Sequence, residues 1–287
     1  MGLRLGPVEH RWSTRDAILY SLGIGARQPQ DLEFLYEHYG PRLEPTLALT
    51  AVTPMLPPLV ERLGIDLRRL LHAGQRLTVV RQLAPAGVVS VTRTITGVWD
   101  KRAAALIECE DAILDDEGIL ATAASQWWLT GAGGFGGPDP PSGSAPGSGS
   151  GLGAGPATPP DRRPDVRTSV QTTTEQAALY RLSGDLNPVH IDPAFARAAG
   201  QPRPILHGLC TLGALGHALG RAFDDRAGDR RLAELSARFR APAFPGDRLD
   251  IEIWIVDDAR ALATVSVAGA LVLGPARASF ARERDGA

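Results

Sequence analysis

The feature that most constrains the fold of this chain is an internal repeat. Three short stretches recur later in the sequence at a nearly constant spacing. They pair residues 13–22 with 173–182, residues 45–47 with 204–206, and residues 81–87 with 240–246. Because the three pairs of matching stretches have nearly the same spacing, we predict that the chain contains two tandem copies of one fold.

A stretch rich in Gly, Pro and Ser separates the two copies. It occupies residues 131–165 and offers little apolar surface for burial, so we expect a mobile linker. The predicted domains are therefore residues 1–130 and residues 166–287. The fragment GSGSGLGAG within the linker superficially resembles a dinucleotide-binding loop, but it follows no predicted strand and opens no predicted helix.

Each copy reads as a helix followed by strands. Ser13/Thr14 and Thr173/Thr174 are natural N-caps for a short helix near the start of each copy. Apolar and polar residues alternate from 248 to 255, as in a strand with one buried face, and a turn leads into a further strand at 261–268. The first copy offers strands at 75–81, 88–96, 103–110 and 120–129. This order predicts an α+β fold whose antiparallel sheet buries one face on the helix.

The composition excludes several classes of function. A net charge of −2 and a pI near 6.3 argue against nucleic acid or an anionic membrane as the main partner. No segment reaches the length of a membrane-spanning apolar run, and residues 1–16 lack the apolar core of a signal peptide. Cys109 and Cys210 lie far apart and form no CxxC pair, which predicts neither a disulfide framework nor a zinc site. We therefore expect a cytoplasmic protein.

The strongest chemical signal lies in residues 180–211, which read YRLSGDLNPVHIDPAFARAAGQPRPILHGLCT. Asp185 and His190 stand five positions apart, with Asn187 and Pro188 between them. A residue that precedes proline is disfavoured in the helical conformation, so this stretch predicts a loop. In such a loop the acid, the amide and the imidazole can all face one small volume.

Two helices are predicted after this loop. Asp192 is a natural N-cap for the first, which Gly200 ends. The second covers residues 208–223, and Gly208 at its start leaves backbone N–H groups uncovered, where the helix dipole favours negative charge. An acid, an imidazole, an amide and free N–H donors suit the addition of water to a polarised, carbonyl-conjugated double bond.

These residues resemble the signature of the MaoC-like, (R)-specific enoyl-CoA hydratases, also called hydratase 2. The runs Y-R-L-S-G-D-x-N-P-x-H, D-P-x-x-A and P-I-L-H-G carry the resemblance. Gln201-Pro202 departs from the family, which usually has Phe after the glycine, and is expected to reshape one wall of the pocket. A weaker resemblance covers the first half, through LGIGA, Tyr36-Glu37, HAGQ and GAGGFGG. The resemblance implies a double hotdog, in which each repeat wraps an antiparallel sheet around a central helix.

The resemblance also implies an activity and roles for four residues. Enzymes of this family add water to trans-2-enoyl-CoA and give (3R)-3-hydroxyacyl-CoA. Asp185 and His190 would hold the water and transfer protons, and either of them could be the base. Asn187 would help to orient the water, and the N–H of Gly208 would bind the thioester oxygen. The resemblance implies no metal and no cofactor, because the CoA thioester is itself the substrate.

The first copy lacks this chemistry. At the spacing that pairs residue 13 with residue 173, the counterparts of Asp185, Asn187 and His190 are Gly25, Arg27 and Gln30. We therefore expect the first half to support the site and to accommodate a medium-chain, long-chain or bulky acyl tail. Two alternatives stay open, namely a 3-hydroxyacyl-thioester dehydratase acting on carrier-bound substrate and a non-catalytic acyl-thioester-binding subunit.

The remaining histidines are interpreted as structural or solvent-exposed, and no pair of them has the spacing of a metal site. They are His10, His38, His72, His207 and His217. Trp127-Trp128 is expected in the core or at an interface, because it ends a predicted strand. A homodimer is a further expectation, since hotdog proteins commonly associate.

Overall fold

The computed structural model describes residues 2–138, 158–227 and 230–282. The first half contains β1 (Leu3–Trp12), α1 (Thr14–Gly23), α2 (Leu32–Leu35), η1 (Glu37–Tyr39), η2 (Pro45–Met55), α3 (Leu56–Leu63), η3 (Leu67–Arg69), β2 (Leu70–Val79), β3 (Gly87–Asp100), β4 (Ala104–Asp115) and β5 (Gly118–Thr130), where η marks a 3₁₀ helix. The second half contains β6 (Val166–Gln171), α4 (Gln176–Tyr180), η4 (Arg181–Ser183), η5 (Pro188–His190), α5 (Pro193–Ala198), α6 (Gly208–Ala227), β7 (Arg230–Arg238), β8 (Arg248–Asp257), β9 (Arg260–Val267) and β10 (Ala270–Arg282).

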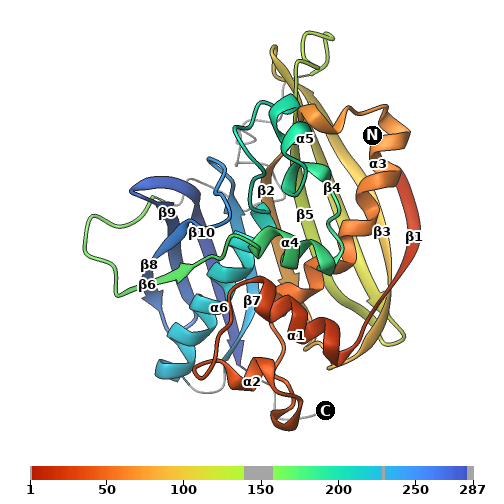
Figure 1. The fold of residues 1–287 in the computed structure, drawn as a ribbon. Coiled ribbons are helices and arrows are strands. Elements are labelled where there is room, and N and C mark those ends of the chain that lie inside the picture. The colour runs from red at the N-terminus through yellow and green to blue at the C-terminus, as the bar shows by residue number, and fades with distance from the viewer. Residues whose placement is uncertain (1, 139–157, 228–229, 283–287) are drawn as a thin grey trace.

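The strands form one antiparallel sheet whose order is symmetrical about its centre (Figure 1). The order is β1-β3-β4-β5-β2-β7-β10-β9-β8-β6, so the second half repeats the first in mirror sequence. The halves join where β2 pairs with β7, and there Arg76 and Leu77 face Ser236 and Leu235. At the spacing that pairs residue 81 with residue 240, these two pairs of residues are each other's counterparts in the repeat. The α+β prediction is confirmed, and the tandem repeat appears as a pseudo-two-fold relation between the halves.

Most of the predicted strands are present, but several strands were missed. The strands expected in the first half correspond to β2, β3, β4 and β5, and those expected in the second half correspond to β8 and β9. The strands β1, β6, β7 and β10 were not predicted. The missed strand β7 reads RRLAELSAR, and its buried positions do not alternate with exposed ones. Three consecutive positions near its end, Leu235 to Ala237, are buried, so the strand carries no clear period-2 signal.

The two predicted helix caps have different outcomes. Ser13 caps α1 in a complete capping box with Asp16, as its sequence position predicts. The expectation that Thr173 or Thr174 caps the second helix is wrong, because α4 begins after Glu175 and no side chain caps it. The Thr174 hydroxyl donates instead to the Glu175 carboxylate, which leaves the threonine in the turn before the helix.

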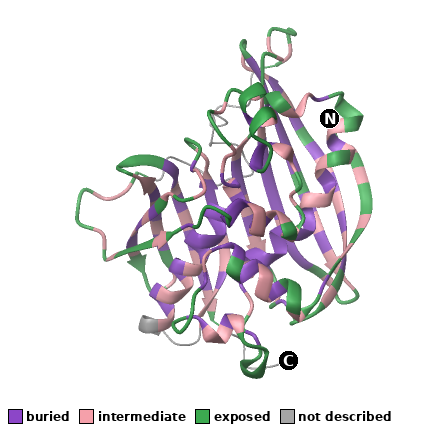
Figure 2. Ribbon diagram, in the orientation of Figure 1, coloured by how far each residue is buried: buried purple, intermediate pink, exposed green. Residues whose placement is uncertain are grey.

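The helices cover one face of the sheet, and buried residues concentrate between these two layers (Figures 1 and 2). Helices α1 and α4 meet near the pseudo-two-fold axis, where the rings of Tyr20 and Tyr180 lie 6.0 Å apart. One apolar cluster runs through both halves, which therefore share a core. Leu77, Leu212 and Leu235 are fully buried members of it. None of the described helices is both long enough and apolar enough to cross a bilayer.

The central helix differs between the halves. In the second half, α6 runs for 20 residues without a proline. In the first half the same region is broken into η2, of 11 residues, and α3, of 8 residues. Pro54 lies inside η2 and has no N–H to donate to an α-helical partner, and Pro57 and Pro58 follow in the first turn of α3. These prolines explain why the first half lacks a continuous central helix.

The ends of the predicted linker pack against the two halves. The Asp100 carboxylate accepts hydrogen bonds from the N–H groups of Gly134 and Gly136, at 2.8 and 2.9 Å. On the other side, Arg162 donates to the Ile255 carbonyl at 2.9 Å. The predicted mobility of the linker falls mainly on residues 139–157, which lie outside the described residues.

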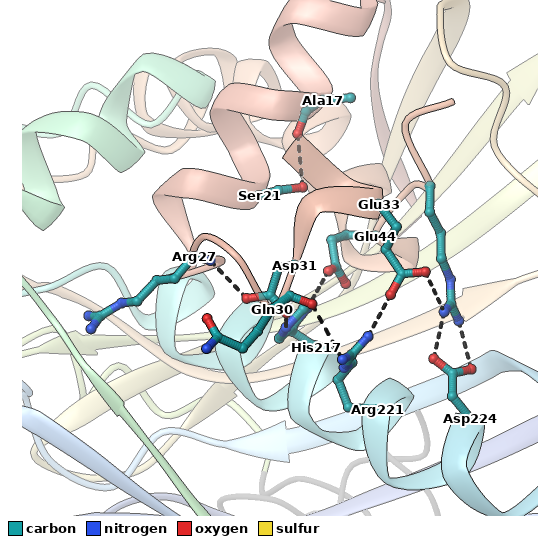
Figure 3. A network of polar contacts seen from close by, with 11 residues as sticks. Ala17, Ser21, Arg27, Gln30, Asp31, Glu33, Glu44, His217, Arg221 and Asp224 are labelled. Carbon is teal, nitrogen blue, oxygen red and sulfur yellow. Dashed lines mark hydrogen bonds and ion pairs between the residues drawn. The ribbon is translucent and has the colours of Figure 1, made fainter. Parts of the chain in front are cut away.

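A cluster of charged groups joins the halves far along α6 (Figure 3). His217 lies between two acids of the first half, with Nδ1 2.6 Å from Glu44 Oε1 and Nε2 3.1 Å from Asp31 Oδ1. Burial opposes a charge on this ring, but the two carboxylates raise the pKa of His217 above its usual value. Nearby, Arg42 forms a bidentate ion pair with Asp224. We call His217, Glu44 and Asp31 the interdomain triad.

Candidate active site

The loop that carries the acid and the imidazole is shaped by its own side chains. Gly184 ends η4 with a φ of +118°, a conformation that favours glycine. The Asp185 carboxylate accepts from the N–H of Asn187 at 3.2 Å, and the Asn187 side chain accepts from the N–H of Val189 at 3.2 Å. Two successive turns of this kind direct the backbone so that His190 returns toward Asp185.

Asp185 and His190 lie side by side without a direct hydrogen bond. His190 Nε2 is 3.9 Å from Asp185 Oδ2, while His190 Nδ1 is 2.9 Å from the carbonyl oxygen of Ile205. Because a carbonyl only accepts, Nδ1 carries the proton and Nε2 presents a lone pair toward the carboxylate. Burial lowers the pKa of His190, and this effect exceeds the opposing effect of Asp185. His190 is therefore a neutral acceptor at pH 7.

His207 supports this pair, although the sequence analysis grouped it with the structural histidines. Its ring stacks on His190 with the centroids 3.6 Å apart, and its Nε2 donates to the backbone carbonyl of Asp185 at 3.2 Å. Burial and the neighbouring His190 lower the pKa of His207 well below its usual value. His207 thus fixes both partners, and its position directly before Gly208 was the available signal.

Gly208 begins α6, and its backbone N–H has no partner within the helix. A side chain at this position would meet Phe239, since an added Cβ would lie 2.9 Å from the Phe239 ring. The glycine therefore allows the Phe239 ring to pack closely against the first turn of α6. Gly208, Asp185, Asn187 and His190 all line the same cavity.

This cavity has a volume of about 440 Å³ and is built by both halves. The second half contributes the catalytic candidates together with Gln201, which departs from the family pattern. The first half contributes residues of η2, α3, η3 and three of its strands, namely Val52, Thr53, Leu56, Leu67, Arg68, Leu70, Leu71, His72, Ala73, Gln75, Arg93, Trp127 and Trp128. The broken central helix of the first half therefore borders the space where a substrate tail would lie.

Arginines gather at the exposed end of the cavity. Arg238 and Arg240 line it, and Arg240 is solvent-exposed. Burial and the charges of Arg240 and Arg277 lower the pKa of Arg238. Like charges at this density favour the binding of an anion. The sequence contains too many arginines for Arg238 and Arg240 to be chosen before the fold is known.

Comparison with known proteins assigns the family. The family described as MaoC-like domain matches residues 156–273, and the family described as MFE-2 hydratase 2 N-terminal domain matches residues 10–128. A Mycobacterium tuberculosis protein named enoyl-CoA hydratase ChsH3 is 39% identical over 274 residues, covering 92% of this chain and 91% of that protein. This chain belongs to the MaoC-like hydratase 2 family. The resemblance found in residues 180–211 is confirmed.

Other members and structural neighbours agree with this assignment. A second Mycobacterium tuberculosis relative, named 3-hydroxyacyl-thioester dehydratase Y, is 34% identical and covers 92% of this chain and 89% of that protein. The crystal structure of a MaoC-like dehydratase from Phytophthora capsici aligns with a TM-score of 0.83 at 25% identity, covering 98% of this chain and 96% of that one. A Mycobacterium tuberculosis protein described as a double hotdog aligns with a TM-score of 0.62. The predicted double hotdog is confirmed.

The hydratase 2 site also contains a set of potential metal ligands. Side-chain atoms of Asp185, His190 and His207 lie within 4.8 Å of one another, although no histidine spacing in the sequence predicted this. Each ring already directs one nitrogen at a backbone carbonyl. The two rings are also stacked face to face, so their in-plane lone pairs do not converge on one point. This geometry suits acid–base chemistry better than tetrahedral coordination.

Proposed function

We propose that this chain reversibly hydrates trans-2-enoyl-CoA to (3R)-3-hydroxyacyl-CoA, with no metal and no cofactor beyond the thioester substrate. The spacing of Asp185 and His190 carries the proposal. An oxygen atom between Asp185 Oδ2 and His190 Nε2, which are 3.9 Å apart, can lie about 2.8 Å from both. Both groups accept hydrogen bonds, so a water molecule there donates both hydrogens and keeps its lone pairs for attack.

The proposed reaction uses this water as the nucleophile. Its oxygen bonds to C3 of the enoyl group while Asp185 removes one of its protons, and His190 holds the other hydrogen. The C2–C3 π electrons move toward the thioester carbonyl, whose oxygen is stabilised by the N–H of Gly208. Asp185 then returns the proton to C2, so the water is added across the double bond without a change in redox state.

The neighbouring residues have supporting roles in this proposal. Asn187 holds the turn that presents Asp185, and its amide group lies at the cavity where it can orient the water. His207 positions Asp185 and His190 through its hydrogen bond and its ring contact. The arginines at the cavity mouth, Arg238 and Arg240, fit the phosphates of CoA.

The proposed substrates have medium-length, long or bulky acyl tails. Support comes from the part of the cavity that the first half builds beneath its broken central helix. A location in the cytoplasm and assembly as a homodimer remain predictions from the sequence.

The test is the loss of enoyl-thioester absorbance when the purified protein is added to trans-2-enoyl-CoAs of increasing chain length. We expect turnover with a 3R product, and better activity on longer or bulkier tails than on crotonyl-CoA. Folded protein that hydrates none of these esters would contradict the proposal.

A second candidate is the reverse reaction on a thioester held by a carrier protein. It is favoured by the relative named 3-hydroxyacyl-thioester dehydratase Y and by the arginines at the cavity mouth, which would also suit an acidic carrier. The same assay with 3-hydroxyacyl-carrier protein separates the two, since the preferred carrier gives the higher kcat/KM. Binding without turnover on either carrier would instead indicate a non-catalytic acyl-thioester-binding subunit.

A further inference from the structure

The cavity lining includes a buried charge. Arg93 projects from β3 beneath η2, and only 1% of its side chain is exposed. Its Nε and Nη2 atoms donate to the two oxygens of Asp111, at 2.7 and 2.8 Å. Its third nitrogen, Nη1, is buried and has no hydrogen-bond partner among the described residues. Arg93 lines the cavity together with Val52, whose carbonyl lies 3.4 Å from Nη2.

A second polar atom without a partner belongs to the same cavity. His72 Nε2 is buried and makes no hydrogen bond with the described residues. The ring is held between Trp127, with centroids 4.2 Å apart, and Phe239, with centroids 4.8 Å apart. Burial and the nearby charge of Arg93 lower the pKa of His72 to about 3, so the ring is neutral at pH 7. Phe239 also packs against Gly208, so the ring of His72 is one residue removed from the proposed N–H donor.

These two groups are unsuited to a purely hydrocarbon tail. Buried polar atoms in proteins are nearly always hydrogen-bonded, and a buried guanidinium is especially costly to leave without a partner. Asp111 satisfies two of the three nitrogens of Arg93 and leaves Nη1 for whatever enters the cavity. An alkyl chain offers it no acceptor, whereas an oxygen atom on the tail does.

We propose that Arg93, assisted by His72, binds an oxygen atom on the acyl tail, so that the preferred substrates carry a carbonyl, hydroxyl or carboxylate group remote from the reacting double bond. This inference rests on the proposed function, because it takes the cavity to hold the tail of an enoyl thioester. It makes Arg93 a specificity residue that contacts the substrate without taking part in the chemical step.

The test compares matched substrates that differ by one oxygen. A long-chain trans-2-enoyl-CoA is set beside keto analogues in which each distal methylene in turn becomes a carbonyl. For the best keto position we expect kcat/KM to exceed that of the alkyl parent by roughly 10- to 100-fold, the effect of one hydrogen bond from a charged donor. Calorimetric titration of the same esters into an Asp185→Asn variant measures the preference in binding alone.

Two variants connect the preference to the proposed residues. Arg93→Met combined with Asp111→Leu removes both ends of the ion pair, so that no unpaired carboxylate is left in the core. His72→Phe keeps the aromatic stack and removes the nitrogen. The keto-to-alkyl ratio should fall toward 1 in the Arg93 double variant and partly in His72→Phe. The matched control is Arg81→Met with Asp115→Leu, an ion pair of the same half that does not line the cavity, and its ratio should stay at the wild-type value.

The outcomes separate this inference from the proposed function. If alkyl enoyl-CoAs are hydrated and no keto analogue has a higher kcat/KM than its alkyl parent, the proposed oxygen-binding subsite is wrong. Buried water is then the partner of Arg93. A preference that survives in the Arg93 double variant also overturns it. If no ester is hydrated at all, the proposed function fails, and the calorimetric preference of the keto esters then decides the subsite separately.

Discussion

Two largely enclosed histidines of this protein lie beside carboxylates, and their pKa values shift in opposite directions. His190 lies 3.9 Å from one carboxylate, and its pKa is lowered because burial outweighs that single distant charge. His217 lies 2.6 and 3.1 Å from two carboxylates, and its pKa is raised because Glu44 and Asp31 together outweigh burial. The number and distance of the acids therefore decide the direction in which the pKa of an enclosed imidazole shifts.

The two sites occupy related places in the repeat. Asp31 follows Gln30, which is the counterpart of His190 in the first copy. In the second half this loop faces the 440 Å³ cavity, whereas in the first half it holds α6 through His217 (Figure 3). One copy of the loop thus carries the proposed chemistry, and the other copy joins the domains.

The largest expected difference between the two loops is in activity. Asp185→Asn and His190→Gln should each lower kcat/KM for trans-2-enoyl-CoA about 1,000-fold, because each removes a group that holds or deprotonates the water. The decrease in enoyl absorbance measures this. Asp31→Asn is the matched control in the first copy and should retain activity within a few-fold. Equal losses in all three variants would contradict the division of roles.

The second prediction concerns stability, for which the first-half contacts of His217 should matter more than His190. His217→Gln should lower the free energy of unfolding by about 3 kcal/mol, because it leaves the carboxylate of Glu44 buried without its charged partner. Urea unfolding followed by circular dichroism measures the loss. Adding Glu44→Gln removes the unpaired charge and should recover part of the stability. A double variant as unstable as the single one, or His190→Gln with the same loss, would show that the interdomain triad has no special role.

Alanine substitutions at two glycines of α6 should have opposite consequences, one for activity and one for stability. Gly208→Ala should lower kcat/KM roughly 10- to 100-fold, because the added methyl lies 2.9 Å from the Phe239 ring and displaces the wall beside the N–H donor. Gly220→Ala meets open space, so it should keep wild-type activity and raise the unfolding free energy by about 0.5–1 kcal/mol. Unchanged kcat/KM in Gly208→Ala would argue against the assigned N–H donor.

The smallest expected effects lie in the dependence of stability on pH, where the two histidines act in opposite directions. The folded-state pKa of His217 is raised, so its contribution is complete below about pH 6.5 and is lost as the pH rises through the folded value. The folded-state pKa of His190 is lowered, so its contribution is complete above about pH 6.5 and is lost as the pH falls. The free energy of unfolding should be measured at a series of pH values around 6.5. Its dependence on pH should become weaker above pH 6.5 in His217→Gln and weaker below pH 6.5 in His190→Gln. If His217→Gln changed the acid side and His190→Gln the alkaline side, the directions of both pKa shifts would be contradicted.

The sequence predicted those parts of the molecule that depend on local order along the chain. Asp185, Asn187 and His190 occupy one loop, and Gly208 opens the next long helix, so a contiguous motif was enough to find them. The nearly constant spacing predicted the repeat, and the pairing of β2 with β7 at the centre of a symmetrical strand order is its structural expression.

The missed residues depend on contacts between distant segments. His72 was grouped with structural histidines because nothing near it in the sequence shows that Phe239 and Trp127 will pack around its ring. His207 acts through the carbonyl of Asp185, a contact that exists only after the loop has folded back. The charge of His217 depends on two acids that belong to the other half of the chain. Such groups can be found only once the packing is known.

The pairing of β2 with β7 has a consequence for how this molecule can change over time. If the two halves were separate identical chains, every substitution would appear on both sides of the symmetry axis, and a change that opened one groove would also damage the reaction centre beside it. Because the halves here are parts of one polypeptide, each position can vary once. Three prolines were therefore able to break one central helix while the other stayed whole. Covalent fusion thus freed each half to specialise independently.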